Sequence, residues 1–133
     1  MPTNPALGNE ELELATGIAT AAVAIGQAVK RDVATGANYY TPCSVSGERY
    51  DGVAYTAADA GKSFTVVLPR RGTVFGKCLA GAAMNANVNA MTNASGKFIL
   101  ATTALHIAGV TLQAASGADV WVAIALEDGD RVV

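Results

Sequence analysis

Cysteine, histidine and aromatic residues are scarce in this sequence of 133 residues. It contains two cysteines, Cys43 and Cys78, a single histidine, His106, and only 6% aromatic residues. No CxxC motif occurs, and these residues supply too few soft ligands for a structural zinc site. Disulfide-stabilised secreted domains usually carry more cysteines on a shorter chain, so we expect both thiols to be unpaired and mostly buried. The sequence predicts no metal and no other cofactor.

Charge is also sparse, and neither sign dominates. Charged residues make up 15% of the chain and the formal net charge is −2, so the sequence lacks the basic face of a nucleic-acid-binding domain. The apolar-rich stretch 18–25 is interrupted by Thr20 and is much shorter than a bilayer-spanning segment. The first residues, MPTNP, lack the basic start and apolar core of a signal peptide. We therefore expect a protein that is kept in a cytosol and contacts neither nucleic acid nor membrane.

The first 15 residues differ from the rest of a chain that is 51% hydrophobic and rich in alanine. Prolines and a glycine interrupt regular structure there, and glutamates and leucines fill residues 10–14. Such a segment cannot form a core of its own. It is either a mobile tail or an arm that crosses a partner surface, with Leu7, Leu12 and Leu14 as anchors. We divide the chain into an N-terminal arm, residues 1–15, and a β domain, residues 16–133.

Turn signals separate short runs of β-branched and aromatic residues through most of this domain. Turn pairs that end in glycine, with Thr, Ser, Ala, Arg or Asp before it, are among these signals, which recur roughly every 8 to 14 residues. The runs 63–68 and 120–126 alternate in polarity, and Trp121 lies on the face opposite the apolar one. The stretch 16–29 fits either a helical face or a strand, and its context favours the strand. The pattern predicts an all-β fold, a small barrel or sandwich of short antiparallel strands.

Two segments of the domain also resemble each other in sequence. The segment 23–72 aligns with the segment 82–129, so that Gly52 falls against Gly109, Val29 against Val88, and the alternating run 64–68 against 120–124. A duplication of one β unit explains the match. Each unit would expose an apolar face and bury it against the other.

Several strings of the sequence follow one recurring order. GQAVKRD is followed by DGVAYTAADAGKSFTVVLPRRG, then by ASGK and by IAGVTLQAASGADVWVAIAL. This run of Gly-Val strands, Ala-Ala-Gly bends and a final alternating strand resembles a family of small bacteriophage proteins, the capsid cement or decoration proteins, some of which are labelled recombinase-like. The resemblance covers about residues 26–126. The arm lies outside it, and the polar stretch 37–50 is longer than the hairpin typical of the family.

The resemblance implies a non-enzymatic, structural virion protein that binds the outer surface of a phage capsid and stabilises it. The implied partners are the major capsid protein and further copies of the chain, with a trimer favoured. The protein would be made in the host cytoplasm and reside on the capsid surface. Arg70 and Arg71 form a basic pair; they are either a solvated turn or a contact with an acidic partner surface. With the leucines of the arm, they are the candidate partner-binding residues.

An alternative is a small β-barrel enzyme or ligand-binding module that uses Cys78 and His106. A cysteine beside a histidine forms a nucleophile pair in several enzyme classes, but the sequence places no third, orienting group with them. The string 56–63 ends in Gly-Lys-Ser, as phosphate-binding loops do, yet a strand rather than a helix follows it. We therefore expect both cysteines and the histidine to be chemically silent.

Overall fold

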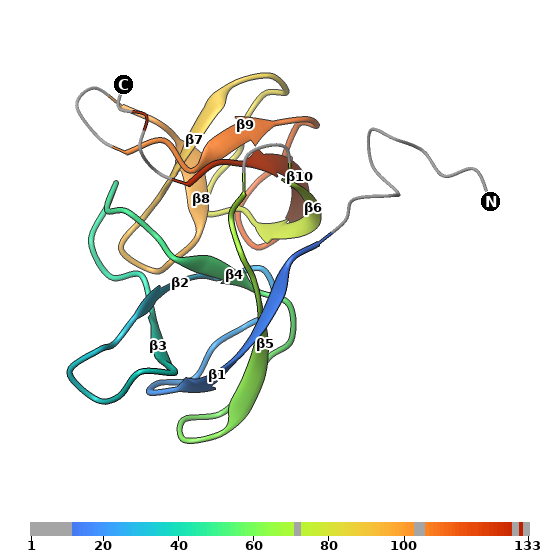
Figure 1. Cartoon of the computed structure of the whole chain (residues 1–133). Helices are drawn as coiled ribbons and strands as arrows, with labels where there is room; N and C mark the ends of the chain where they lie inside the picture. Colours follow the sequence, from blue (N-terminus) through green and yellow to red (C-terminus); the bar gives the residue numbers. More distant parts are fainter. Residues whose placement is uncertain (1–11, 71–72, 103–105, 129–130, 132–133) are drawn as a thin grey trace.

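A computed structural model describes residues 12–70, 73–102, 106–128 and 131. The described chain is all-β and contains no helix, which confirms the predicted fold class, including a strand rather than a helix within 16–29 (Figure 1). Its ten strands are β1 (Leu14–Ala19), β2 (Ala28–Arg31), β3 (Tyr39–Pro42), β4 (Gly52–Ala54), β5 (Ser63–Val67), β6 (Thr73–Leu79), β7 (Asn89–Thr92), β8 (Phe98–Leu100), β9 (Gly109–Thr111) and β10 (Trp121–Leu126).

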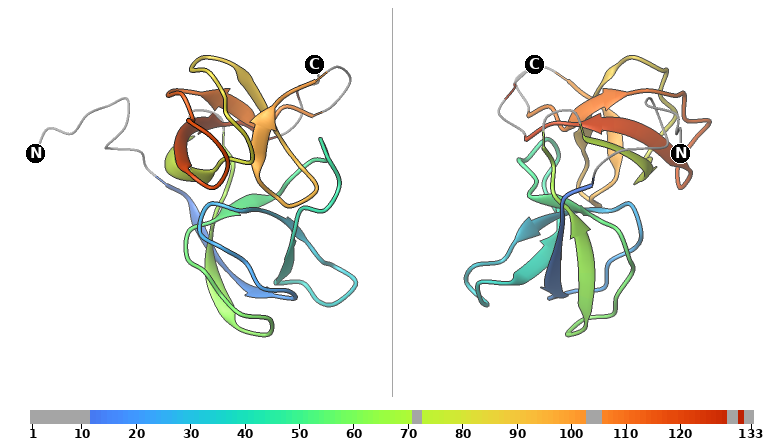
Figure 2. Two further views of the ribbon diagram at one scale, coloured as in Figure 1. Left: turned by 180° about the vertical axis from the view of Figure 1, so that it is seen from behind. Right: turned by 45° about the vertical axis from the view of Figure 1, so that its right-hand side comes forward.

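The strands form two units of five. Strands β1 to β5 close a barrel in the order β1-β3-β2-β4-β5, and β6 to β10 form a sheet in the order β6-β10-β9-β7-β8. The two units lie one on the other in all three views (Figures 1 and 2). The predicted antiparallel pairing holds for every pair of named strands except β1 and β3, which pair in parallel because the β2–β3 hairpin folds back beside β1.

The second unit repeats the topology of the first. The antiparallel pairs β1–β5, β2–β3, β2–β4 and β4–β5 correspond to β6–β10, β7–β8, β7–β9 and β9–β10. The parallel β1–β3 pair corresponds to an isolated parallel bridge from Ala80 to Phe98. A bridge from Val23 to Ala58 likewise corresponds to one from Met84 to Ala115. The two units therefore share one topology, as the internal sequence match predicts.

The strand register corrects two parts of the predicted internal alignment. Gly52 and Gly109 correspond, as predicted, but Val29 corresponds to Ala90 rather than Val88. The run 64–68 corresponds to 122–126 rather than 120–124. Both errors are shifts of two residues, which leave every side chain on the same face of its strand. The apolar pattern alone therefore does not distinguish the two alignments.

A close approach of strands explains why both units carry glycine at the corresponding position. A Cβ atom on Gly52 would collide with the side chain of Val66, and one on Gly109 would collide with the carbonyl oxygen of Ala125. Neither position has room for any side chain. The match of Gly52 with Gly109 therefore reflects one steric constraint that acts in both units.

Two hydrophobic clusters fill the fold. The smaller lies within the barrel and contains Phe64 and Val66, with Leu68 packed against it, so the alternation predicted for 63–68 is confirmed. The larger, here called the shared core, joins the units and includes Tyr50, Val53, Val67, Phe75, Phe98, Val122, Ile124 and Leu126. Strand β5 thus contributes one face to each cluster, because Val67 points opposite to its neighbours. The units are two halves of one folded body.

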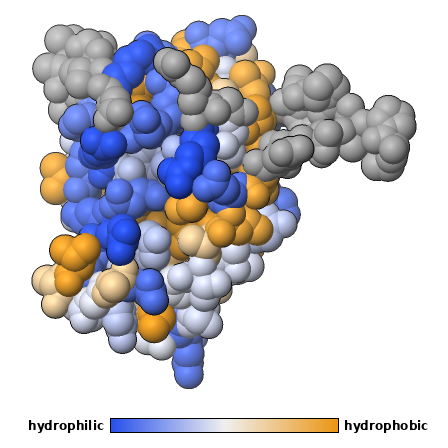
Figure 3. Space-filling view, in the orientation of Figure 1, coloured by the Kyte–Doolittle hydropathy of each residue, from blue (hydrophilic) through white to orange (hydrophobic). Residues whose placement is uncertain are grey.

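Several large apolar side chains nevertheless remain at the surface. Those at least 37% exposed are Leu14, Val33, Val45, Tyr55, Leu100, Leu112 and Trp121. Trp121 is thus exposed while Val122, Ile124 and Leu126 are fully buried, as the alternation of 120–126 predicts. Figure 3 shows apolar surface, in orange, in a band at the right of this face, over the region of β6 and β10 in Figure 1.

Tyr50 attaches the loop between β3 and β4 to the second unit. Its side chain is 1% exposed, and its ring meets Phe98 edge to face with the centroids 6.1 Å apart. The hydroxyl lies 2.8 Å from the carbonyl oxygen of Ala108 and 2.9 Å from that of Glu127. Its single hydrogen therefore serves two carbonyl groups of the second unit. Burial raises the pKa of Tyr50 well above its ordinary value, so the phenol stays protonated.

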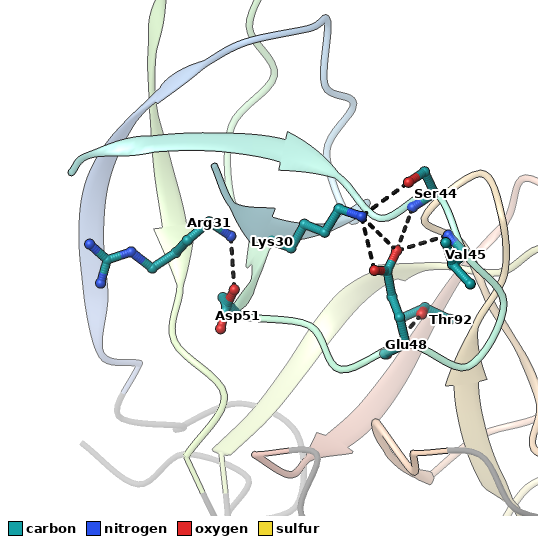
Figure 4. Close-up of polar contacts among 7 residues, drawn as sticks. All are labelled: Lys30, Arg31, Ser44, Val45, Glu48, Asp51 and Thr92. Carbon is teal, nitrogen blue, oxygen red and sulfur yellow. Dashed lines mark hydrogen bonds and ion pairs between the residues drawn. The ribbon is translucent and has the colours of Figure 1, made fainter. Parts of the chain in front are cut away.

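Glu48 holds the same loop in shape (Figure 4). Its carboxylate accepts hydrogen bonds from Nζ of Lys30 at 2.9 Å and from the backbone N–H groups of Ser44 and Val45 at 2.7 and 2.8 Å. Burial on its own raises the pKa of Glu48, but these donors and the Lys30 charge outweigh it and lower the pKa. The backbone N–H of Gly47 also donates to the carbonyl of Thr92, 2.7 Å away. The polar stretch that is too long for the resembled family is thus an ordered bridge to the second unit.

Replacing Tyr50 by Phe should destabilise the protein by about 0.5–1.5 kcal/mol, because the hydrogen bonds from the hydroxyl to the carbonyl groups of Ala108 and Glu127 are lost. The measurement is the free energy of unfolding from urea titration. Tyr55→Phe is the matched control: Tyr55 is 44% exposed, so its change should stay within about 0.5 kcal/mol. Equal stability of the Tyr50→Phe and wild-type proteins would show that the hydroxyl does not join the units.

Replacing Glu48 by Gln should lower stability at pH 7 by about 1–2 kcal/mol, because the carboxylate loses charge-assisted hydrogen bonds. The pKa of Glu48 is lowered in the folded state, so its contribution is present above the unfolded-state pKa and is lost as the pH falls through the folded-state value. The difference between the two proteins in urea titrations should therefore shrink from about pH 6 towards pH 3. A difference that is constant over this range contradicts the assignment.

Candidate interaction surface

The residues predicted to contact a partner meet at the base of the arm. Leu12 is half-buried and packs against the shared core, whereas Leu14 begins β1 and is 48% exposed. The guanidinium of Arg70 lies 3.2 Å from a carboxylate oxygen of Glu13, and both side chains are more than half exposed. Leu7 and Arg71 lie outside the described residues. The structure thus places Leu12, Leu14 and Arg70 near one another and gives Arg70 a partner in its own chain.

Leu12 also lines a surface depression of about 480 Å³, together with Tyr55, Phe75, Gly76 and Lys77. We call it the junction depression, because Tyr55 follows β4 of the first unit whereas the last three residues belong to β6 of the second. The rings of Tyr55 and Phe75 lie 5.9 Å apart and are tilted by 39°. Two aromatic side chains, one from each unit, therefore line the depression where the units meet; we call this pair its aromatic floor.

A cation borders this aromatic floor. Nζ of Lys77 lies 4.9 Å from the ring centroid of Trp121, which is 51% exposed. Within the described ranges no carboxylate forms an ion pair with Lys77. The ring faces the ammonium group in a cation–π contact, which satisfies the charge only in part. The junction depression thus combines apolar surface with a positive charge that an anionic ligand or partner can approach.

Two further depressions occupy corresponding places in the two units. Each surrounds one of the isolated bridges, and alanine lines much of both. The first, of about 330 Å³, is lined by Ala22, Val23, Ala57, Ala58 and Asp59. The second, of about 280 Å³, is lined by Ala83, Met84, Asn85, Val88, Leu100, Ala114 and Ala115. The duplication has therefore given the molecule two similar shallow surfaces of small side chains.

The residues of the alternative, enzymatic interpretation lie in unreactive surroundings. Cys78 is fully buried in β6, and burial raises the pKa of its thiol above its ordinary range. Burial, assisted by the nearby Glu48 carboxylate, raises the pKa of Cys43 to about 12. Since the thiolate is the nucleophile, neither protonated thiol is suited to attack a substrate. The backbone N–H of His106 donates to the carbonyl of Gly47 and ties the histidine to the loop.

The described chain contains neither a cluster of potential metal ligands nor a helix that could span a membrane. Its His, Cys, Asp and Glu residues form no group of three or more that could hold a metal ion. The described residues also contain no helix long and apolar enough to cross a bilayer. Lys62 of the Gly-Lys-Ser string is exposed in a turn that leads directly into β5, so a strand follows it, as predicted.

Comparisons with known proteins found a similarity of fold. No model of a protein family matches the sequence, and neither does any curated protein. Among solved structures, the fold is similar to that of the head fiber gp8.5 N base of bacteriophage phi29, with a TM-score of 0.70. The chain shares a fold with a phage head fiber. The match covers 92% of this chain and 99% of the other at 14% identity, and at this identity it concerns the fold alone.

Sequence analysis identified Leu12 but missed the rest of the junction depression. Tyr55 and Phe75 lie 20 positions apart and meet only because the two units pack together. The one local signal was the aromatic ring of Trp121 on the exposed face of an alternating strand, beside the position that Lys77 reaches. An exposed tryptophan is worth examining as a contact residue, because it offers a large apolar area at little entropic cost.

Both thiols should resist modification in the folded protein. With Ellman's reagent at pH 8, the native chain should show less than about one tenth of the reaction seen in denaturant, because both sulfurs are buried and protonated. The measurement is thiol absorbance over time with and without urea. Rapid reaction of one equivalent in the native protein would revive the enzymatic alternative.

Proposed function

We propose that the protein is a structural component of a bacteriophage virion that binds the outer surface of the capsid and stabilises it, without catalysis. The observation that carries the proposal is the similarity to a phage head fiber base over 92% of the chain. The resemblance of the motif order to capsid cement proteins supports it independently, because that resemblance rests on sequence strings and the other on backbone geometry.

The surface of the protein is suited to binding a partner through a large contact area. Large exposed side chains such as Leu14, Leu100 and Trp121 offer apolar contact, and the paired alanine-lined depressions allow close approach of another backbone. The shared core and the loop held by Tyr50 make the two units one rigid body. A rigid body that spans neighbouring capsid subunits and binds only the assembled state stabilises that state by mass action.

The proposed partners are the major capsid protein and further copies of this chain, with a trimer on the capsid surface of the virion. Leu7, Leu12, Leu14, Arg70 and Arg71 remain the proposed contact residues. Because Arg70 is paired with Glu13 in the isolated chain, binding to an acidic surface would exchange one carboxylate partner for another. Such an exposed pair is weak enough to exchange.

The test uses capsids assembled from the major capsid protein of the same genome. Adding the purified chain should raise the temperature at which these particles lose integrity, followed by light scattering. Leu14→Glu should abolish this effect while the chain stays folded, because Leu14 is 48% exposed and the change places an unpaired charge in the proposed contact. Failure of the wild-type chain to bind the capsids at micromolar concentration would overturn the proposed function.

The structure also sharpens a truncation test. Deleting residues 2–14 would remove Leu12 from the shared core and Leu14 from its pairing with Val67, so a loss of function could simply reflect unfolding. Deleting residues 2–11 leaves both contacts in place and should change the free energy of unfolding by less than about 0.5 kcal/mol. If the arm is a binding element, this shorter chain should protect capsids from heat less well than the full chain.

A further inference from the structure

We propose that residues 1–11 of one copy dock into the junction depression of a second copy and thereby join the copies into a ring. The inference deepens the proposed function, on which it rests for the trimer. It names the segment and the site through which the copies meet. It stands on the place of the junction depression in the fold, its chemistry and the sequence of the segment.

The C-terminal end of the segment adjoins the depression, because residue 11 precedes Leu12. Leu12, the first described residue, lines the junction depression and packs against the shared core. An extended chain covers about 3.5 Å per residue, so residues 1–11 reach up to about 38 Å from that point. A segment of this length can extend beyond its own molecule and contact a neighbouring copy.

The chemistry of the segment complements the site. Tyr55, Phe75 and Lys77 line the depression, and the ammonium group of Lys77 lies 4.9 Å from the ring centroid of Trp121. Besides Met1, the segment carries one large apolar residue, Leu7, which is followed by two carboxylates in its last two positions, 10 and 11. Leu7 matches the aromatic floor, and the carboxylates match a cation that pairs with no carboxylate in the described chain. Apolar and charged complementarity therefore coincide.

A second copy is a better source of the segment than the same chain. Leu12 already fills one side of its own depression, and Leu7 is only five positions away, so returning to the same site requires a sharp reversal. An extended crossing to a neighbour requires none. In a heterologous interface, each copy contributes a different surface. Such interfaces form a closed ring when the rotation that relates neighbouring copies brings the last copy back to the first. Arm exchange is thus compatible with the proposed trimer.

Gly76 is a position in the depression at which a cysteine can be introduced without disturbing the fold. A Cβ atom there has no neighbour within 4 Å, and the backbone is not in the left-handed region. Both native cysteines are buried, so a Leu7→Cys chain and a Gly76→Cys chain each carry one accessible thiol. Mixing the two full-length chains, one enlarged by a tag, and oxidising them should yield a disulfide-linked heterodimer of distinct mass on a non-reducing gel.

Gly117 provides the matched control, because a Cβ atom there also meets nothing within 4 Å and the residue does not line the depression. Leu7→Cys with Gly117→Cys should give less than about one tenth of the heterodimer, since disulfides require Cα atoms within about 7 Å. Equal yields from both pairs would mean random collision and would overturn the proposal. A Leu7→Cys/Gly76→Cys double variant that closes only within single chains would assign the depression to its own arm.

A second variant tests the assembly without cross-linking. Gly76→Glu places a carboxylate among the apolar and acidic groups of the docked segment, so it should weaken self-association at least about a hundredfold in sedimentation experiments. Gly117→Glu should leave the association unchanged, and both variants should unfold at the wild-type urea concentration. Full-strength association of Gly76→Glu would overturn the inference. A monomeric Gly76→Glu chain that still bound capsids would leave the proposed function intact, and a cross-linked ring that bound none would overturn the function alone.

Discussion

The burial of Tyr50 between the two units is the contact on which the rest of the molecule depends. A β unit of about 60 residues buries too small a fraction of its surface to be more than marginally stable on its own. Here the larger hydrophobic cluster contains side chains from both units. Tyr50 belongs to this cluster, and its hydroxyl donates to carbonyl groups of the opposite unit. Because one side chain packs in the shared core and also hydrogen-bonds to the second unit, the position of the loop and the packing of the units are fixed together.

Duplication explains the architecture, and the departures from symmetry create its distinctive surface. The two units share their strand pairs, their isolated bridges and the glycine at the same close approach. The β3–β4 loop breaks the symmetry, because Glu48 closes it on itself and Gly47 ties it to Thr92. Where the units pack together, Tyr55 of one comes against Phe75 of the other. The junction depression is therefore formed by both units together and by neither alone.

Local patterns predicted the fold well and the site only in part. The alternating runs identified β5 and β10 and the exposure of Trp121, because a period of two is fixed by strand geometry. The same period hid the shift of two residues in the internal alignment, and it carried no information on the parallel pairing of β1 with β3. The contact between Tyr55 and Phe75 depends on how the units pack, which no window of sequence contains. Leu12 was identified because it is apolar in an acidic segment.

The internal chemistry of the chain favours a role that depends on surface area. Burial keeps both thiols protonated, and Glu48 is committed to its own loop. Lys97 and Arg131, like Arg70, already hold a carboxylate of the same chain. Lys77, in contrast, contacts the ring of Trp121, pairs with no carboxylate among the described residues, and lines the junction depression. Such a site is completed by a chain that brings both a leucine and a carboxylate, and the sequence places both just ahead of Leu12. The N-terminal segment, which reads as an ordinary acidic tail in the sequence, is therefore chemically complementary to the junction depression.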